Sequence, residues 1–363
     1  MGRLPSHWDL VVAGSTPAVL AQAGGVAQRQ SARVVTSRPA LLIHADRPAR
    51  SCDRQGDRLL SQLSDKTHPE RPVVPLAPTH RAIPVWDGYA GGPTVVRVAD
   101  TETLLQAYDE QMRGIGNPGR PGLVIERDGP VLRAAGQHRG FVTTSPDLGV
   151  DGPELDALIA RQRDYFAARG EAVEWKTRGH DLPGSLTGRL RAAGFVPEDQ
   201  ETVVIGVAAD MAADPVAPDG ATLREVSADA DLRAIAAMET TIWGVDLSYL
   251  GEELIVRRAS APGDISFFSV TDDTTGQVVS AAWIVYHPGT DFAYLSGGST
   301  LEAWRKRGIY RALVAVRARQ AAMRGTRYLT VDASDDSAPI LRRLGFQAVT
   351  TTTPYVWTPP AAA

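Results

Sequence analysis

The same order of predicted helices and strands occurs twice between residues 82 and 358. Each copy closes with a helix, a glycine and a phenylalanine, at Arg189–Phe195 in the first and at Leu341–Phe346 in the second. The glycine permits the left-handed backbone that stops a helix, and the phenylalanine returns the chain to the core. The recurrence predicts two similar domains, at residues 82–213 and 221–358. The Pro-rich segment Asp214–Gly220 is the predicted linker between them.

Hydrophobic periodicity supplies the predicted elements of both copies. The second copy has predicted strands at Thr222–Val226, Ile265–Val270, Val278–Tyr286, Phe292–Thr300, Tyr328–Val331, Gln347–Thr351 and Tyr355–Trp357, and helices at Asp231–Trp243, Leu247–Arg258, Ile309–Met323 and Ser337–Leu344. The first has predicted strands at Thr94–Val98, Leu123–Glu126, Val131–Ala135, Phe141–Thr144, Ala172–Lys176 and Thr202–Val207, and helices at Thr101–Met112, Pro153–Arg169 and Pro183–Ala193. Strands interspersed with helices predict an α/β (α+β) fold in each domain.

Residues 1–81 differ from the rest of the chain in composition. This leader holds only one of the chain's aromatic residues, Trp8, and carries 11 Lys and Arg against 6 Asp and Glu. It has no sustained hydrophobic period and too few large apolar side chains to offset the entropy of ordering. We therefore expect a disordered leader. Gly24–Arg33 resembles translation across a transfer-RNA gene, which leads to the hypothesis that the leader is not native coding sequence.

Composition argues against several classes of protein. The net charge of −4 does not favour a dedicated nucleic-acid binder, although the basic leader by itself leaves a nucleic-acid arm as an alternative. A single cysteine, Cys52, excludes an internal disulfide and a multi-cysteine metal site. No apolar run approaches the roughly 18 residues that span a bilayer. We expect a cytoplasmic protein with no metal, no nucleic-acid partner and no membrane partner.

Three consecutive cations, Arg305, Lys306 and Arg307, precede Gly308 between a predicted strand and a predicted helix. The first turn of a helix leaves its N–H groups without partners, and together with the positive end of the helix dipole they favour an anion such as a pyrophosphate. Gly308 lets phosphate oxygens approach the backbone. The alternative is a solvated basic turn, and spacing alone does not decide between the two.

The pattern Arg305-x-x-Gly308-x-Tyr310 resembles the Arg/Gln-x-x-Gly-x-Gly/Ala pyrophosphate loop of the GNAT superfamily of acyl-CoA-dependent N-acyltransferases. The order of elements over residues 222–358 is similar to that fold, which implies two GNAT-like domains in tandem, each with a mixed sheet. The resemblance implies an N-acetyltransferase that moves an acetyl group from acetyl-CoA to an amine of a small molecule by direct attack in a ternary complex. The implied cofactor-binding residues are Gly298, Ser299 and Thr300 for the pantetheine arm, and Arg305, Lys306, Arg307, Gly308, Ile309, Tyr310 and Arg311 for the pyrophosphate.

The catalytic residues do not transfer by position. Ser334 and Leu341 stand where the family commonly has Asn and the Tyr that protonates the CoA thiolate, and Tyr310 stands where it has Gly or Ala. The candidate bases are Asp332 and Glu239, and the candidate acids are Tyr310 and Tyr294, while His287 fits a turn better than a base. For each of these side chains, an ordinary role as a surface, capping or packing residue is favoured over the catalytic one. The alternative function is a CoA-binding or regulatory module without turnover.

Other polar residues have weaker assignments. Glu239, Asp246, Glu252 and Glu253, near Trp243 and Tyr249, lie on helices that line the acceptor side in this family and favour a cationic amine, unless they form a solvated helix face. In the first copy, Asp147, Asp151 and Glu154 place negative charge where a pyrophosphate would lie, so we predict that this degenerate half binds no acyl-CoA. Glu174–Asp181 is interpreted chiefly as a loop. The acceptor, an acyl chain other than acetyl and the oligomeric state remain open.

Overall fold

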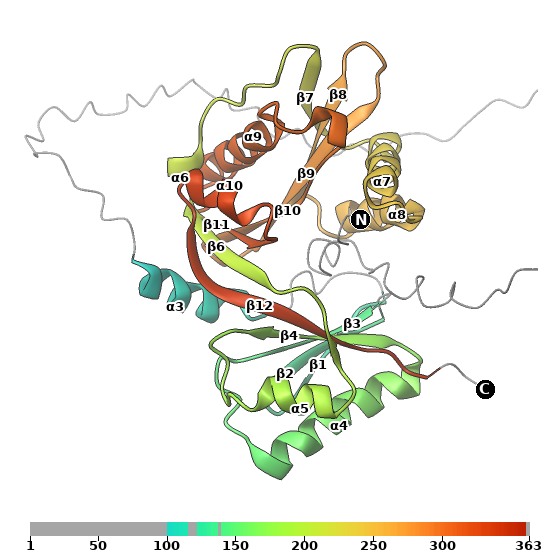
Figure 1. The fold of residues 1–363 in the computed structure, drawn as a ribbon, viewed down its shortest axis with the longest axis vertical. Helices are drawn as coiled ribbons and strands as arrows, with labels where there is room; N and C mark the ends of the chain where they lie inside the picture. Colours follow the sequence, from blue (N-terminus) through green and yellow to red (C-terminus); the bar gives the residue numbers. More distant parts are fainter. Residues whose placement is uncertain (1–99, 115–121, 137–138, 361–363) are drawn as a thin grey trace, which may run out of the picture. The chain divides into compact units, whose positions relative to one another are not determined.

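The computed structural model of the protein describes residues 100–114, 122–136 and 139–360 (Figure 1). The leader and the predicted strand at Thr94–Val98 lie outside these residues. None of the helices in the described residues is long and apolar enough to cross a membrane. The same residues contain no group of three or more His, Cys, Asp or Glu side chains placed to hold a metal ion.

The elements of the first half follow the predicted order. They are α3 (Thr101–Met112), β1 (Val124–Asp128), β2 (Val131–Ala135), β3 (Arg139–Thr144), α4 (Gly152–Arg169), β4 (Ala172–Arg178), α5 (Leu186–Ala192), β5 (Val196–Pro197) and β6 (Glu201–Val207). A single turn of helix, α6 (Ala208–Met211), leads to the linker. The strand β4 extends to Arg178, so the first part of the segment that we interpreted chiefly as a loop is strand, and only its last residues form the turn.

The second half agrees closely with its predicted elements. They are β7 (Ala221–Val226), α7 (Asp229–Trp243), α8 (Ser248–Ser260), β8 (Ile265–Asp272), β9 (Val278–Tyr286), β10 (Phe292–Thr300), the 3₁₀ turn η1 (Glu302–Trp304), α9 (Ile309–Met323), β11 (Tyr328–Ala333), α10 (Ala338–Arg343) and β12 (Gln347–Trp357). The two strands predicted at the end of the chain form one strand, β12, which runs through Pro354.

The strands form one mixed sheet in the order β1-β2-β3-β4-β12-β6-β11-β10-β9-β8-β7. The closing strands of the two halves are interleaved, since β6 of the first half pairs with β11 of the second. Correspondingly, β12 of the second half pairs with β4 of the first, with Tyr355 opposite Trp175. Figure 1 shows β6 and β12 side by side between the two sets of strands. Each half therefore completes its part of the sheet with a strand from the other half.

Helices cover opposite faces of the second half of the sheet. Alternate residues of β10 separate the two faces, because side chains along a strand point in opposite directions. Ala293 and Leu295 pack with Leu313 of α9, whereas Tyr294 packs with the residues of α7 and α8. Figure 1 shows α9 and α10 on one side of β9 and α7 and α8 on the other. The loop that leads into α9 and the side chain of Tyr294 therefore approach β10 from opposite faces.

Candidate active site

The segment between β10 and α9 forms a cradle of backbone N–H groups. Lys306 has φ 63° and Gly308 has φ 85°, so two left-handed residues alternate with Arg307. Left-handed residues at alternate positions are typical of backbone nests, in which successive N–H groups bind an anion. No side chain caps the start of α9, so the N–H groups of its first turn add to the same site. A Cβ atom added to Gly308 would meet no atom within 4 Å, which leaves room for a ligand above the backbone.

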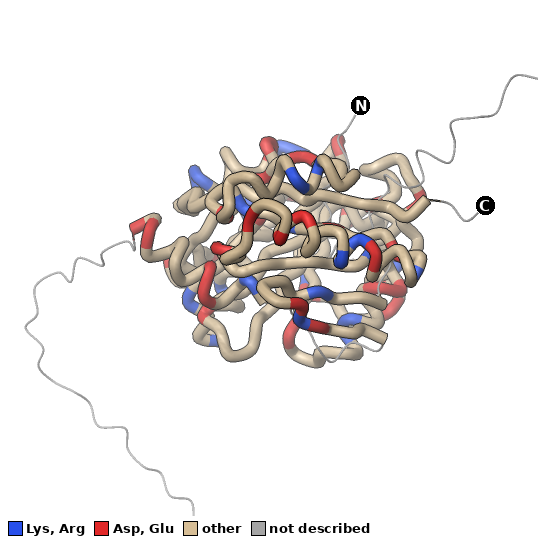
Figure 2. Tube along the Cα trace, turned by 90° about the horizontal axis from the view of Figure 1, so that it is seen from below, with Lys and Arg blue, Asp and Glu red and all other residues tan. Residues whose placement is uncertain are grey.

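The three cations of the loop are exposed to solvent. The Arg305 side chain turns back, and its Nε donates to the carbonyl oxygen of Thr300 at 3.0 Å. The Arg307 guanidinium lies 4.5 Å from the centre of the Trp304 ring. In the part of the chain that the structure describes, no carboxylate pairs with either arginine or with Lys306. Figure 2 shows acidic and basic residues interspersed along the described chain, so these adjacent cations concentrate positive charge locally.

Next to the cradle, β10 separates from β11. The two strands pair in parallel only from Phe292 to Tyr294. Beyond this point β10 continues along β9 with a bulge between Ser296 and Ser299, while β11 continues along β6. Among the described residues no strand fills the opening between the last part of β10 and the end of β11. An extended ligand that carries amide groups can pair with a strand edge of this kind.

Close contacts fix the end of β10 at this opening. A Cβ atom on Gly298 would lie 2.8 Å from Cε2 of Tyr310, so the Tyr310 ring packs against β10. The carbonyl oxygen of Ser299 accepts a hydrogen bond from the Ser280 hydroxyl. The carbonyl oxygen of Thr300 accepts the bond from Arg305 described above. The ligand-binding roles of Gly298, Ser299 and Thr300 remain predictions, as do those of Arg305 to Arg311.

Asp332 lies on β11 beside the opening and forms a buried ion pair. Its side chain is 3% exposed, and Oδ2 lies 2.7 Å from Nζ of Lys176, which is fully buried on β4 of the first half. Lys176 also lies 3.8 Å from Oε2 of Glu201 on β6. The second carboxylate oxygen of Asp332, Oδ1, has no hydrogen-bond partner among the described residues. The first half therefore supplies the counter-charge to a candidate base of the second.

Two further candidates, Glu239 and Tyr294, lie on different elements of the same face. Glu239 is buried on α7, and its Oε2 accepts a hydrogen bond from Nε1 of Trp243 at 2.9 Å. Tyr294 is buried on β10 directly opposite Thr330 of β11, two residues before Asp332. Tyr294 and Asp332 thus share one face of the sheet at the mouth of the opening. Their catalytic roles, and that of Glu239, remain predictions.

His287 occupies the turn that follows β9, where its carbonyl oxygen accepts from both N and Oγ1 of Thr290. Burial, with a smaller contribution from Arg257, lowers the pKa of His287 to about 4. The turn lies at the end of β9 that pairs with Ala293, whereas the bulge lies further along β10. The location and the low pKa both argue against a base that works near neutral pH.

The low pKa of His287 predicts a pH-dependent stability. The unfolded chain takes up this proton near pH 6.5 and the folded chain only near pH 4, so the free energy of unfolding falls as the pH is lowered from 6.5 towards 4. The variant His287→Gln is expected to lose less stability over this interval. Urea unfolding of both proteins at several pH values measures the difference, and parallel curves from pH 7 to pH 4 would contradict it.

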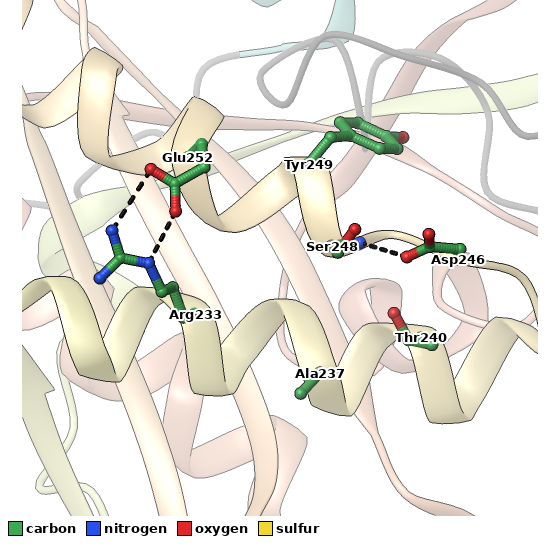
Figure 3. Close-up of a pocket in the computed structure, with 7 residues that line it drawn as sticks. All are labelled: Arg233, Ala237, Thr240, Asp246, Ser248, Tyr249 and Glu252. Atoms are coloured by element: carbon green, nitrogen blue, oxygen red, sulfur yellow. Dashed lines mark hydrogen bonds and ion pairs between the residues drawn. The ribbon is translucent and has the colours of Figure 1, made fainter. Parts of the chain in front are cut away.

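A groove of about 640 Å³ lies between α7 and α8 (Figure 3). Arg233 and Glu252 form an ion pair across it at 2.6 Å, and Asp246 Oδ1 accepts a hydrogen bond from the backbone N–H of Ser248. Tyr249 also lines the groove. Of the acidic residues assigned to the acceptor side, Asp246 and Glu252 line this groove, whereas Glu239 is buried elsewhere on α7. Glu253 does not line it either, and a role for these acids on the acceptor side stays a prediction.

In the first half the start of α4 corresponds to the start of α9, and here the helix is capped by one of the protein's own side chains. Oδ1 of Asp151, the N-cap residue of α4, accepts hydrogen bonds from the N–H of Gly152 and the hydroxyl of Ser185. The backbone of Leu182 bonds to Pro146 and Leu148, and so fastens the preceding loop. The Asp151 carboxylate therefore occupies the start of α4, and that this half binds no acyl-CoA stays a prediction.

Two residues near the site were not identified from the sequence. Lys176 is placed beside Asp332 by the pairing of strands that are far apart in the chain, which local periodicity does not encode. Arg317 is 2% exposed in the middle of α9. Its position four residues after Leu313 and four before Ala321, both fully buried, was a usable signal, because residues at this spacing share one face of a helix.

Comparison with known proteins identifies the fold. No protein-family model and no curated protein matches the chain. A solved structure of a GCN5-related N-acetyltransferase from Kribbella flavida superposes with a TM-score of 0.51 at 18% identity, over 72% of this chain and 95% of that one. The chain has the GNAT fold.

Two further GNAT structures are similar at lower scores. A tandem GNAT protein from the clavulanic acid biosynthesis pathway matches with a TM-score of 0.49 at 14% identity, over 67% of this chain and 86% of that one. A GCN5-related N-acetyltransferase from Sphaerobacter thermophilus matches with a TM-score of 0.49 at 16% identity, over 64% of this chain and 82% of that one.

Proposed function

We propose that the protein is an acetyl-CoA-dependent N-acetyltransferase whose second half binds acetyl-CoA and transfers the acetyl group to an amine of a small molecule. The observation that carries the proposal is the cradle of Lys306 and Gly308 at the uncapped start of α9, next to the open edge of β10. A pyrophosphate fits the first feature by charge and hydrogen bonding. The amide-containing pantetheine arm fits the second.

Residues of this chain provide the chemistry that the reaction needs. The neutral amine attacks the thioester carbonyl carbon, the carbon–sulfur bond breaks, and CoA leaves as a thiolate. Oδ1 of Asp332 is suited to accept the proton released by the amine, directly or through water, since Lys176 engages Oδ2. An N–H group of β10 is suited to stabilise the oxyanion. Water can protonate the thiolate, so the reaction does not require the tyrosine that Leu341 replaces.

A CoA-binding module without turnover is the second candidate. Leu341 is fully buried in the core between the sheet and α9, and the Ser334 hydroxyl bonds to Ser337. The residues at these two positions therefore serve packing and local structure. This candidate shares the cofactor site and differs only in lacking an acceptor.

Calorimetry with CoA and acetyl-CoA, followed by free-thiol release with a panel of amines, tests both candidates. Binding of both nucleotides with amine-dependent thiol release supports the transferase. Binding without release on any amine favours the module. Absence of binding to either nucleotide contradicts both.

A further inference from the structure

We infer that Arg317 is a positioning residue, which holds the bulge of β10 so that the backbone N–H of Gly297 faces the opening beside β11 and donates to the acetyl carbonyl oxygen. The inference rests on the proposed function and concerns the donor that the oxyanion needs. Arg317 acts on the reaction only through the backbone of β10.

The Arg317 guanidinium lies in the core and binds three backbone carbonyls. Nε donates to Leu313 at 2.8 Å, and Nη1 donates to Trp283 at 3.1 Å and to Ser296 at 3.2 Å. Among the described residues no carboxylate pairs with this side chain. Burial lowers the pKa of Arg317 to about 10, so it remains a cation near neutral pH. Burying an arginine without an anionic partner costs free energy of folding. An apolar side chain would fill this space without that cost.

The two shared carbonyls show what the arginine does. Trp283 on β9 and Ser296 on β10 are paired residues at the last regular step before the bulge. Because one nitrogen binds both oxygens, the Ser296 carbonyl points towards β9. A regular ladder would satisfy such carbonyls with strand N–H groups, and at the bulge this register is lost. Arg317 therefore gives both carbonyls a side-chain donor at the point where the register shifts.

The direction of this carbonyl determines the direction of the next N–H group. The peptide between Ser296 and Gly297 is trans, since the described residues contain a single cis peptide, at Leu182–Pro183. In a planar trans peptide the N–H points opposite to the C=O. The N–H of Gly297 is consequently directed away from β9, towards the opening where β11 no longer pairs with β10.

Gly297 is fixed in this orientation by its surroundings. Its φ is 62°, and a Cβ atom would lie 2.0 Å from the Trp283 ring, so the position accepts only glycine. Tyr310 packs against the next residue, Gly298. The bulge is thus held by the arginine on one side and by two aromatic rings, and the donor is organised before a ligand arrives. Preorganised donors of this kind stabilise a developing oxyanion most effectively.

The test is isotope-edited infrared spectroscopy of [1-¹³C]acetyl-CoA bound to the full-length protein. In the wild type a hydrogen bond from Gly297 is expected to lower the carbonyl stretching frequency relative to the free cofactor. Arg317→Met is expected to lose this downshift, while its affinity for CoA, measured by calorimetry, stays within about threefold of wild type. With an acceptor in hand, turnover is expected to fall by about 100-fold.

Two further variants complete the experiment. Arg319→Met removes an exposed arginine of the same helix, paired with Asp214, and is expected to keep the wild-type downshift. Arg317→Lys retains the charge with a less extensive set of donors and is expected to give a smaller downshift, so it provides the test if Arg317→Met does not fold. A full wild-type downshift in either Arg317 variant, or no downshift in the wild type, overturns the inference. Failure of the wild type to bind CoA overturns the proposed function instead.

Discussion

Gly308→Asp is expected to weaken acetyl-CoA binding by about 1,000-fold, because the new carboxylate stands where the pyrophosphate would bind. Two negative unit charges about 4 Å apart near a protein surface repel each other by about 4 kcal/mol, and this energy corresponds to the expected loss of affinity. The substitution is compatible with folding. A Cβ atom at Gly308 meets nothing within 4 Å, and an acidic side chain at the start of α9 interacts favourably with the helix dipole.

A variant at the other end of the same helix serves as the control for backbone strain. Gly325 has φ 79° and an equally open environment, whereas Gly308 has φ 85°. Gly325→Asp introduces the same side chain into the same left-handed conformation, away from the loop cations, and is expected to bind acetyl-CoA as the wild type does. Gly308→Asn adds similar bulk without charge and is expected to lose less affinity than Gly308→Asp. Calorimetry measures all three, and unchanged binding by Gly308→Asp would remove the basis of the cofactor assignment.

Local patterns of the sequence predicted the part of the fold that carries the candidate cofactor site. The observed bounds of β10 and α9, Phe292–Thr300 and Ile309–Met323, are those predicted. Each element has a clear period, and the loop between them is marked by charge and glycine. The left-handed backbone conformation of Lys306 could not be predicted from such patterns. A lysine gives no sequence signal for φ 63°, a conformation that costs an L-residue about 1–2 kcal/mol.

The order of the strands in the sheet could not be predicted from such local patterns. A period of two residues identifies a strand and its buried face, but it does not identify the neighbouring strand. The interleaving of β6 and β12 depends on pairing between segments that are distant in sequence. Pro354, which divided β12 into two predicted strands, is accommodated beside Lys176 of β4. The contacts between the halves, including the one at Asp332, follow from this strand order.

Interleaving changes how the first half contributes to the candidate site. The sequence suggested a degenerate copy that binds no acyl-CoA. In the structure Lys176 on β4 of that half forms an ion pair with Asp332 on β11. Removing the acidic residues before α4 would therefore test only the prediction that the first half binds no acyl-CoA. The chemical contribution of this half is tested at Lys176.

Lys176→Met is expected to lower the free energy of unfolding by about 3–5 kcal/mol, the effect of leaving a buried charge without its partner. Lys176 is fully buried, and it lies 2.7 Å from Asp332 and 3.8 Å from Glu201. Methionine nearly matches the lysine stem in shape, so the loss reports the charge rather than a cavity. Urea unfolding followed by circular dichroism measures it.

Two comparisons separate the buried pair from a general effect of losing an ion pair. Arg233→Met removes the cation of the exposed pair with Glu252, whose side chains are 53% and 62% exposed, and is expected to cost less than about 1 kcal/mol. The double variant Lys176→Met with Asp332→Asn removes both charges and is expected to recover part of the loss. If Lys176→Met is as mild as Arg233→Met, Asp332 does not depend on the first half for its charge. Its role as a base that is positioned by both halves would then lose its physical support.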